Sequence, residues 1–239
     1  MKRFFLTLFL VLLSLPAMAV TVTFQEGVSG YAGTTDTQIK ETAATTNYGT
    51  QDHGEITHYA ANDRTNTLLR FDLSTLPSNI TVSSVTLQVR QTTTYANTNV
   101  LRGYRLLRNW SESQATWNVY STGNSWGTAG ALNTTSDHDS TESTSLSVGT
   151  GNNYYTFPTS TQWQNDIQNF ASGSQTNYGW VFISDSPTSS YHDFHHSEYA
   201  TSADRPLLTI IYTENAGGGS VTNLSVNSDL KIGTDFKVQ

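Results

Sequence analysis

The sequence predicts an all-β fold: an antiparallel β-sandwich with jelly-roll-like topology and one short helix. Short segments of alternating apolar and polar residues recur along the chain, separated by Gly, Asn, Ser and Pro. One segment has the period of a helix instead. Charged residues make up 13% of the chain, about half the usual fraction. Thr, Ser, Asn and Gly supply the polarity, and this composition favours strands and turns.

The clearest predicted strand covers residues 82–90. Val85, Leu87 and Val89 point to one face of this strand, so Arg90 points to the other. The other predicted strands span residues 20–24, 67–72, 100–107, 153–157, 180–184 and 207–212. Many short strands in one continuous segment indicate two packed antiparallel sheets.

The predicted helix carries three large apolar residues on one face. Trp163, Ile167 and Phe170 stand at positions i, i+4 and i+7. Thr and Ser residues precede this segment and Gly173 follows it, which is typical of helix caps. We expect Trp163 to belong to the core.

The N-terminus resembles a secretory signal peptide. Lys2 and Arg3 form a basic region, residues 4–15 an apolar one, and Ala17-Met18-Ala19 a small-residue cleavage pattern. The apolar stretch is shorter than the span of about 20 residues that a membrane helix needs. We therefore expect cleavage after Ala19, an exported protein that is secreted or held at the cell surface, and no membrane insertion.

The remaining chain is expected to hold one domain and a tail. Residues 20–214 form the predicted sandwich, 215–220 a Gly-rich linker, and 221–239 a tail with strand-like alternation. Nineteen residues are too few for a core of their own. The tail is expected either to begin a further module or to pair with another chain.

Composition and charge exclude several classes of protein. The chain has no cysteine, which rules out a disulfide scaffold, a Cys-ligated metal site and a cysteine nucleophile. Its formal net charge of −7 argues against a nucleic-acid binder.

The arginines are unevenly distributed. Six of them fall between Arg64 and Arg108 together with a single acid, which gives that segment a charge of +5. We expect Arg70, Arg90 and Arg102 to face outward, with Tyr104 on the same face as Arg102. An outward row of this kind suits a uronate or sulfated polysaccharide, because guanidinium pairs bidentately with carboxylate or sulfate. The alternative is that these arginines pair with acids elsewhere in the fold.

The tryptophans offer a second kind of sugar contact. Trp126 lies among Gly and Ser residues, where an exposed indole can stack on a sugar ring, so we take it as a contact candidate. Trp110 and Trp117 are expected to be structural.

Motifs along the chain resemble those of the DNRLRE domain, grouped with the family-96 carbohydrate-binding modules. The motifs that carry the resemblance are Asp36-Thr37-Gln38-Ile39, Thr46-Asn47-Tyr48-Gly49, Leu68 to Pro77, Val82 to Leu87, Trp110-Ser111-Glu112, Ala115 to Asn118, Ser125 to Gly130, Asn177 to Trp180 and Arg205 to Thr209. The family's late F-x-S-R-E reads Phe194-His195-His196-Ser197-Glu198 here, with the arginine replaced. The resemblance implies a secreted β-sandwich that binds polysaccharide without catalysis.

Metal binding is a further expectation. Modules of the kind implied by the resemblance often hold a structural calcium ion, and Asp36, Asp137, Asp139 and Glu198 lie in or near its motifs. The alternative is zinc or another transition metal. Its candidate ligands are His192, Asp193, His195, His196 and Glu198, and in a strand His192, His196 and Glu198 share one face.

Catalytic motifs are absent from the sequence: it has no GxSxG elbow, no HExxH and no P-loop. A lyase would need a base beside a charge-neutralising arginine, for which Tyr104 and Arg102 are the candidates. The predicted function is non-catalytic binding of an acidic extracellular polysaccharide. The alternatives are a structural or adhesive surface module and, second, a small polysaccharide-degrading enzyme.

Overall fold

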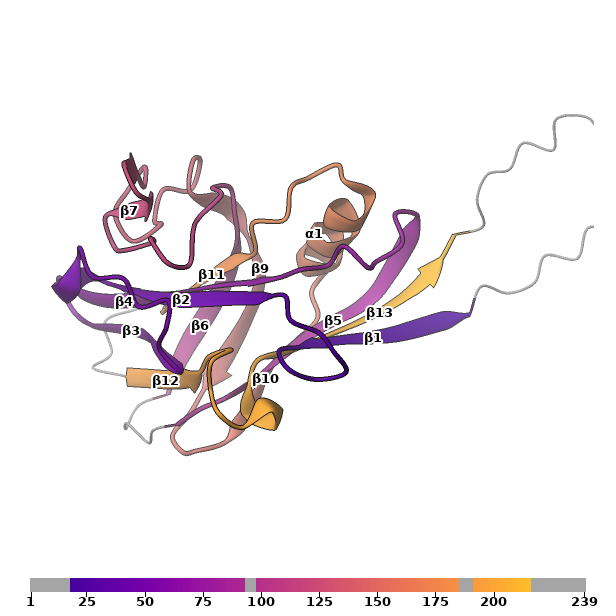
Figure 1. The fold of residues 1–239 in the computed structure, drawn as a ribbon, viewed down its shortest axis with the longest axis horizontal. Coiled ribbons are helices and arrows are strands. Elements are labelled where there is room, and N and C mark those ends of the chain that lie inside the picture. Colours follow the sequence, from indigo (N-terminus) through magenta and orange to yellow (C-terminus); the bar gives the residue numbers. More distant parts are fainter. Residues whose placement is uncertain (1–17, 93–97, 185–190, 216–239) are drawn as a thin grey trace, which may run out of the picture.

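The computed structural model describes residues 18–92, 98–184 and 191–215, which form a two-sheet sandwich with one α-helix (Figure 1). The elements are β1 (Ala19–Gln25), β2 (Thr34–Lys40), η1 (Glu41–Ala43), β3 (His53–Ala60), β4 (Asp63–Phe71), β5 (Ile80–Arg90), β6 (Asn99–Leu106), β7 (Val119–Ser121), β8 (Asn124–Ser125), β9 (His138–Val148), β10 (Tyr154–Phe157), α1 (Thr161–Ser172), β11 (Trp180–Ser184), β12 (Tyr191–His195), η2 (Ser202–Asp204) and β13 (Leu207–Glu214). The predicted all-β class is confirmed. Residues 1–17 of the predicted signal peptide, most of the linker and the tail lie outside the described residues, and β1 begins at Ala19, the last residue of that predicted peptide.

Both large sheets are antiparallel. The first has the strand order β1-β13-β5-β10, and the second has the order β12-β3-β4-β11-β6-β9, with β2 also paired to β4. In Figure 1, β1 and β13 run side by side at one end of the sandwich. The short strands β7 and β8 form a separate hairpin.

Strand β5 shows how the sequence pattern builds the core. Val85, Leu87 and Val89 are buried between the sheets, as their alternation predicts. Val82 is buried as well, although it is out of phase with these three. A register shift against β13 restores the phase, because Ile211 pairs with Ser84 while Tyr212 pairs with Val82.

Helix α1 closes one side of the core. The Ser160 hydroxyl accepts a hydrogen bond from the Trp163 amide at 3.0 Å, and Gly173 ends the helix with a φ of 74°. Trp163 and Ile167 are fully buried, and Phe170 packs against the same cluster. The predicted helix, its caps and its buried face are confirmed.

The seven-stranded sheet is buried on both faces. Along β4, Leu69 and Phe71 enter the core between the sheets, whereas Leu68 enters a second apolar cluster on the opposite face. The segment 107–137 folds over this opposite face, and Trp117 is among the residues that it contributes to the second cluster. In Figure 1 the part of this segment around β7 lies beside β2, β4 and β11. Gly130 is required here, because a Cβ atom would lie 2.5 Å from the Trp117 ring.

Replacing Leu87 by Ala should therefore lower the free energy of unfolding by about 2–5 kcal/mol, because the side chain is 1% exposed and the cavity cannot fill. Denaturant unfolding measures this loss. Gln88→Ala, on the other face of β5, is the control and should cost less than about 1 kcal/mol. Equal losses for the two variants would contradict the assigned faces.

Candidate functional site

The three predicted ligand-binding arginines point away from the core, but they do not form one row. Arg90 projects from the outer face of the four-stranded sheet, since its neighbour Val89 is in the core. Arg70 and Arg102 project from the outer face of the seven-stranded sheet. The sandwich therefore separates Arg90 from the other two. Sequence alternation identified the outward direction but not the sheet to which each strand belongs.

Several arginines of the basic segment are held by acids of the fold. Arg102 pairs with Glu142 through Nη1. Arg105 Nη2 lies 2.6 Å from Asp139 Oδ2, and its Nε lies 3.4 Å from Asp166 Oδ1. Arg108 Nε lies 3.7 Å from Asp137 Oδ1. For these residues the structure supports the alternative of internal pairing, and Arg102 is not an open binding residue.

Arg70 has a different environment. Its Nε donates to Thr35 Oγ1 at 3.2 Å, and its guanidinium carbon lies 5.3 Å from the centroid of the Trp110 ring. No carboxylate of the described residues lies within 4 Å of it. Burial lowers the pKa of Arg70, although nearby Glu112 and Asp72 act in the opposite direction. The guanidinium stays charged at neutral pH, because arginine keeps its proton throughout the physiological range.

Arg70 lines an open groove of about 590 Å³. The groove runs between the start of β2, the end of β4 and the end of α1, and both polar and apolar residues line it. The polar residues that line it are Thr34, Thr35, Arg70, Asp72, Ser74, Thr176 and Asn177. A second groove, of about 330 Å³, shares Asp72 and Ser74 with it and continues past Tyr31. The two grooves therefore adjoin each other on the surface.

Trp126 is not an exposed stacking platform, and that prediction is wrong. Its indole is 5% exposed, and its Nε1 donates to the Thr116 carbonyl at 2.9 Å. The physical reason is that the segment 107–137 covers an apolar sheet face, so its indoles complete a second core. Trp110 and Trp117 are buried in the same cluster, which confirms their predicted structural role.

Tyr104 is half-buried rather than open. Its ring lies 4.8 Å from that of His138 and packs against the second apolar cluster. An exposed aromatic beside an arginine occurs instead on the other sheet: Tyr154 is 46% exposed, and Arg90 lies 4.7 Å from its ring centroid. The sequence analysis missed this pair because it depends on the register of β10 against β5.

The four predicted calcium ligands do not form one site. Asp137 accepts hydrogen bonds from the amides of Gly127, Thr128 and Asn133 at 2.7, 2.9 and 3.1 Å, so it organises its own loop. Asp139 pairs with Arg105. Neither carboxylate belongs to the group of close metal-ligating side chains among the described residues, which contains Asp36 and Glu198 instead.

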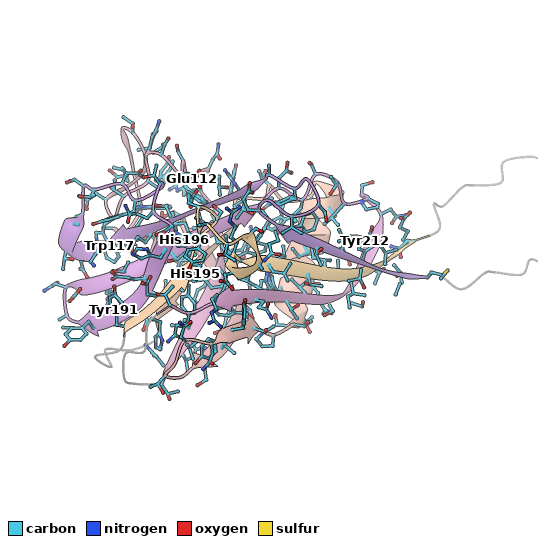
Figure 2. The ribbon with its side chains drawn as sticks, turned by 60° about the horizontal axis from the view of Figure 1, so that its bottom comes forward. Glu112, Trp117, Tyr191, His195, His196 and Tyr212 are labelled. Atoms are coloured by element: carbon cyan, nitrogen blue, oxygen red, sulfur yellow. The ribbon has the colours of Figure 1, made fainter. Side chains whose placement is uncertain are left out.

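Asp36 and Glu198 do come together, joined by Glu112 and His196. We call these four residues the acid–histidine cluster. The Asp36 amide donates to Glu112 Oε1 at 2.7 Å, and Asp36 Oδ2 accepts from the Ser197 amide at 2.9 Å. His196 Nδ1 lies 3.4 Å from Asp36 Oδ1. Figure 2 shows Glu112 and His196 close together, with His195 beside them.

Burial governs the charge of the acid–histidine cluster. It raises the pKa of Asp36 to about 7, and the nearby Glu112 charge acts in the same direction. It also raises the pKa of Glu112 and of Glu198. Burial lowers the pKa of His196 to about 4, so the imidazole is neutral at neutral pH. The cluster therefore brings three acids together. Among the described residues, no positively charged side chain lies within 4 Å of the Asp36 carboxylate.

The acid–histidine cluster brings together residues from three separate sequence motifs. Asp36 belongs to the first, Glu112 to Trp110-Ser111-Glu112, and Glu198 to the late motif around β12. Glu112 was not predicted as a site residue, and only its place in a motif could have identified it. The other zinc candidates lie apart: His192 is buried with its Nδ1 3.4 Å from Gln91, His195 stacks on Tyr199, and β12 ends at His195.

A two-sheet antiparallel sandwich with a surface groove is an architecture of non-covalent glycan-binding modules. The sequence matches carbohydrate-binding module family 96 over residues 28–212, and the chain belongs to that family. It is therefore a carbohydrate-binding module. No curated protein matches the sequence. Among the described residues, no helix has the length and apolar character of a membrane span.

Replacing Asp137 by Asn should lower the free energy of unfolding by about 2–4 kcal/mol, because charge-assisted bonds to three amides are weakened. Thermal and denaturant unfolding, each with and without a chelator, measure the loss. We expect the same loss in both conditions, and Asp63→Asn, on β4, should change stability by no more than about 0.5 kcal/mol. A loss that vanishes on chelation would make Asp137 a metal ligand after all.

Proposed function

We propose that this module binds an anionic polysaccharide, uronate or sulfated, in the groove beside Arg70. The observation that carries the proposal is a guanidinium without a carboxylate partner among the described residues, in an open groove of a carbohydrate-binding module. A carboxylate or sulfate on the sugar chain supplies the missing partner.

The surroundings of Arg70 prepare it for such a ligand. The Arg70 Nε donates a hydrogen bond to Thr35 Oγ1, and the guanidinium carbon lies over the Trp110 ring. These two contacts restrict the side chain before a ligand binds. The Nη edge of the guanidinium is left for a bidentate pair. Along the groove, Ser74 and Thr176 offer groups that hydrogen-bond sugar hydroxyls. This arrangement suits a charged, hydroxyl-rich polymer.

The proposed function is binding without catalysis. The pair that a lyase would have needed is engaged elsewhere, because Arg102 pairs with Glu142 and Tyr104 packs against His138. Membership of a binding-module family supports the same conclusion.

We propose export as the setting for this activity. Lys2, Arg3, the apolar residues 4–15 and the Ala17-Met18-Ala19 pattern support secretion and an extracellular or cell-surface location. The ligand then belongs to a matrix, capsule or similar extracellular polymer. The segment 221–239 is proposed to connect the module to a further domain or another chain.

Arg70→Ala should weaken binding to a polyuronate or sulfated oligosaccharide by about 5- to 30-fold, the scale of about 1–2 kcal/mol for a charge-assisted hydrogen bond. Isothermal titration calorimetry measures the affinity, and circular dichroism checks the fold. Arg64→Ala is the matched control, since Arg64 lies on the same sheet outside the groove and should leave affinity unchanged. If Arg70→Ala binds normally and Arg90→Ala does not, the ligand lies on the Tyr154 face instead.

The affinity for the anionic polymer should fall steeply between low salt and about 0.5 M salt, because an exposed ion pair is screened. A neutral glucan, titrated at the same salt concentrations, is the comparator. Tight binding of the neutral glucan, with none to anionic polymers, would contradict the proposed ligand class while leaving the groove in place.

A further inference from the structure

The interior of the acid–histidine cluster contains polar atoms without partners. His196 is 2% exposed, and neither of its ring nitrogens has a hydrogen-bond partner. Asp36 is 1% exposed, and its Oδ1 is also without one. Leaving such groups unpaired is costly, and buried polar atoms in native proteins nearly always have a partner. The two unpaired groups face each other, with His196 Nδ1 3.4 Å from Asp36 Oδ1.

That separation fits a metal ion between the two atoms. A tetrahedral ion with ligand bonds of about 2.1 Å places neighbouring ligand atoms about 3.4 Å apart. A carboxylate oxygen of Glu198 completes a group of three ligand atoms that all lie within 4.8 Å of one another. Glu198 is exposed, so its side chain is free to approach from the solvent side. Among the described residues, this is the one group of three or more His, Asp or Glu side chains with such spacing.

We propose that Asp36, His196 and Glu198 bind a divalent transition metal of the zinc class, with water in the fourth position. Calcium takes six to eight oxygen ligands, whereas one imidazole and two carboxylates form a donor set suited to zinc. Two carboxylates also neutralise a doubly charged ion. A transition metal thus takes the place of the expected calcium ion. Of the four predicted acids, it uses Asp36 and Glu198.

The surrounding residues orient the ligands. The Ser197 amide holds Asp36 Oδ2, which leaves Oδ1 to face the imidazole. Gly54 makes room for the ring, because a Cβ atom there would lie 2.2 Å from His196 Cε1 and Nε2. Contacts of this kind, made behind the ligands, orient metal-binding side chains in proteins. The metal joins β2 to the segment after β12, so it acts as a structural clamp and goes beyond the proposed glycan site.

The test uses the whole chain, stripped of metal by chelation and then titrated with Zn²⁺ in a calorimeter. We expect one ion per chain and a higher melting temperature in the presence of zinc, because a ligand of the native state stabilises it by mass action. His196→Asn should weaken zinc binding at least 100-fold. Co²⁺ in place of Zn²⁺ should give the visible absorption of a tetrahedral site in the wild type and lose it in the variant.

Two further variants keep the test decisive. Glu198→Gln changes an exposed side chain, so it should fold normally and bind zinc about 10-fold more weakly. His58→Asn removes a histidine of β3 outside the cluster and should bind zinc like the wild type. Absence of stoichiometric zinc binding, or equal binding by wild type and Glu198→Gln, would overturn the proposal. So would tighter binding of Ca²⁺ than of Zn²⁺ by the wild type. Glycan affinity is measured separately, so failure here leaves the Arg70 groove untouched.

Discussion

The seven-stranded sheet is apolar on both faces, and the fold has to cover both. The four-stranded sheet and α1 cover one face, while the segment 107–137 covers the other with its tryptophans. In a sandwich with one solvent-exposed face per sheet, Leu68, Leu106 and Val181 would be exposed to water. This double coverage decides which side chains remain available to a ligand.

The covering segment limits which side chains are available to a ligand. The covering segment brings Asp137 into its own loop and accounts for the ion pair of Arg108. The covering segment also places Trp110 against Arg70, where this segment meets the groove. Arg70 is therefore available because it lies at a boundary of the cover. The acid–histidine cluster lies at a second boundary, where β2 meets the chain that follows β12.

Local sequence patterns predicted the fold well and the site only in part. The alternation in β5 and the 3.6-residue period of α1 are local properties, and both were confirmed. Trp126 was misjudged because Gly and Ser neighbours suggest exposure, whereas burial depends on a sheet face formed by distant strands. The convergence of Asp36, Glu112 and Glu198 depends on three separate segments. Spacing along one chain cannot show such a meeting.

We propose that glycan binds at the groove beside Arg70 and not on the covering segment or the Tyr154 face. Hydrogen exchange of the module, with and without a saturating polyuronate oligosaccharide, tests it most directly. We expect new protection in residues 32–35, 70–74 and 176–177, which line the groove. Protection confined to residues 107–137, or to β10 and the neighbouring end of β5, would contradict it.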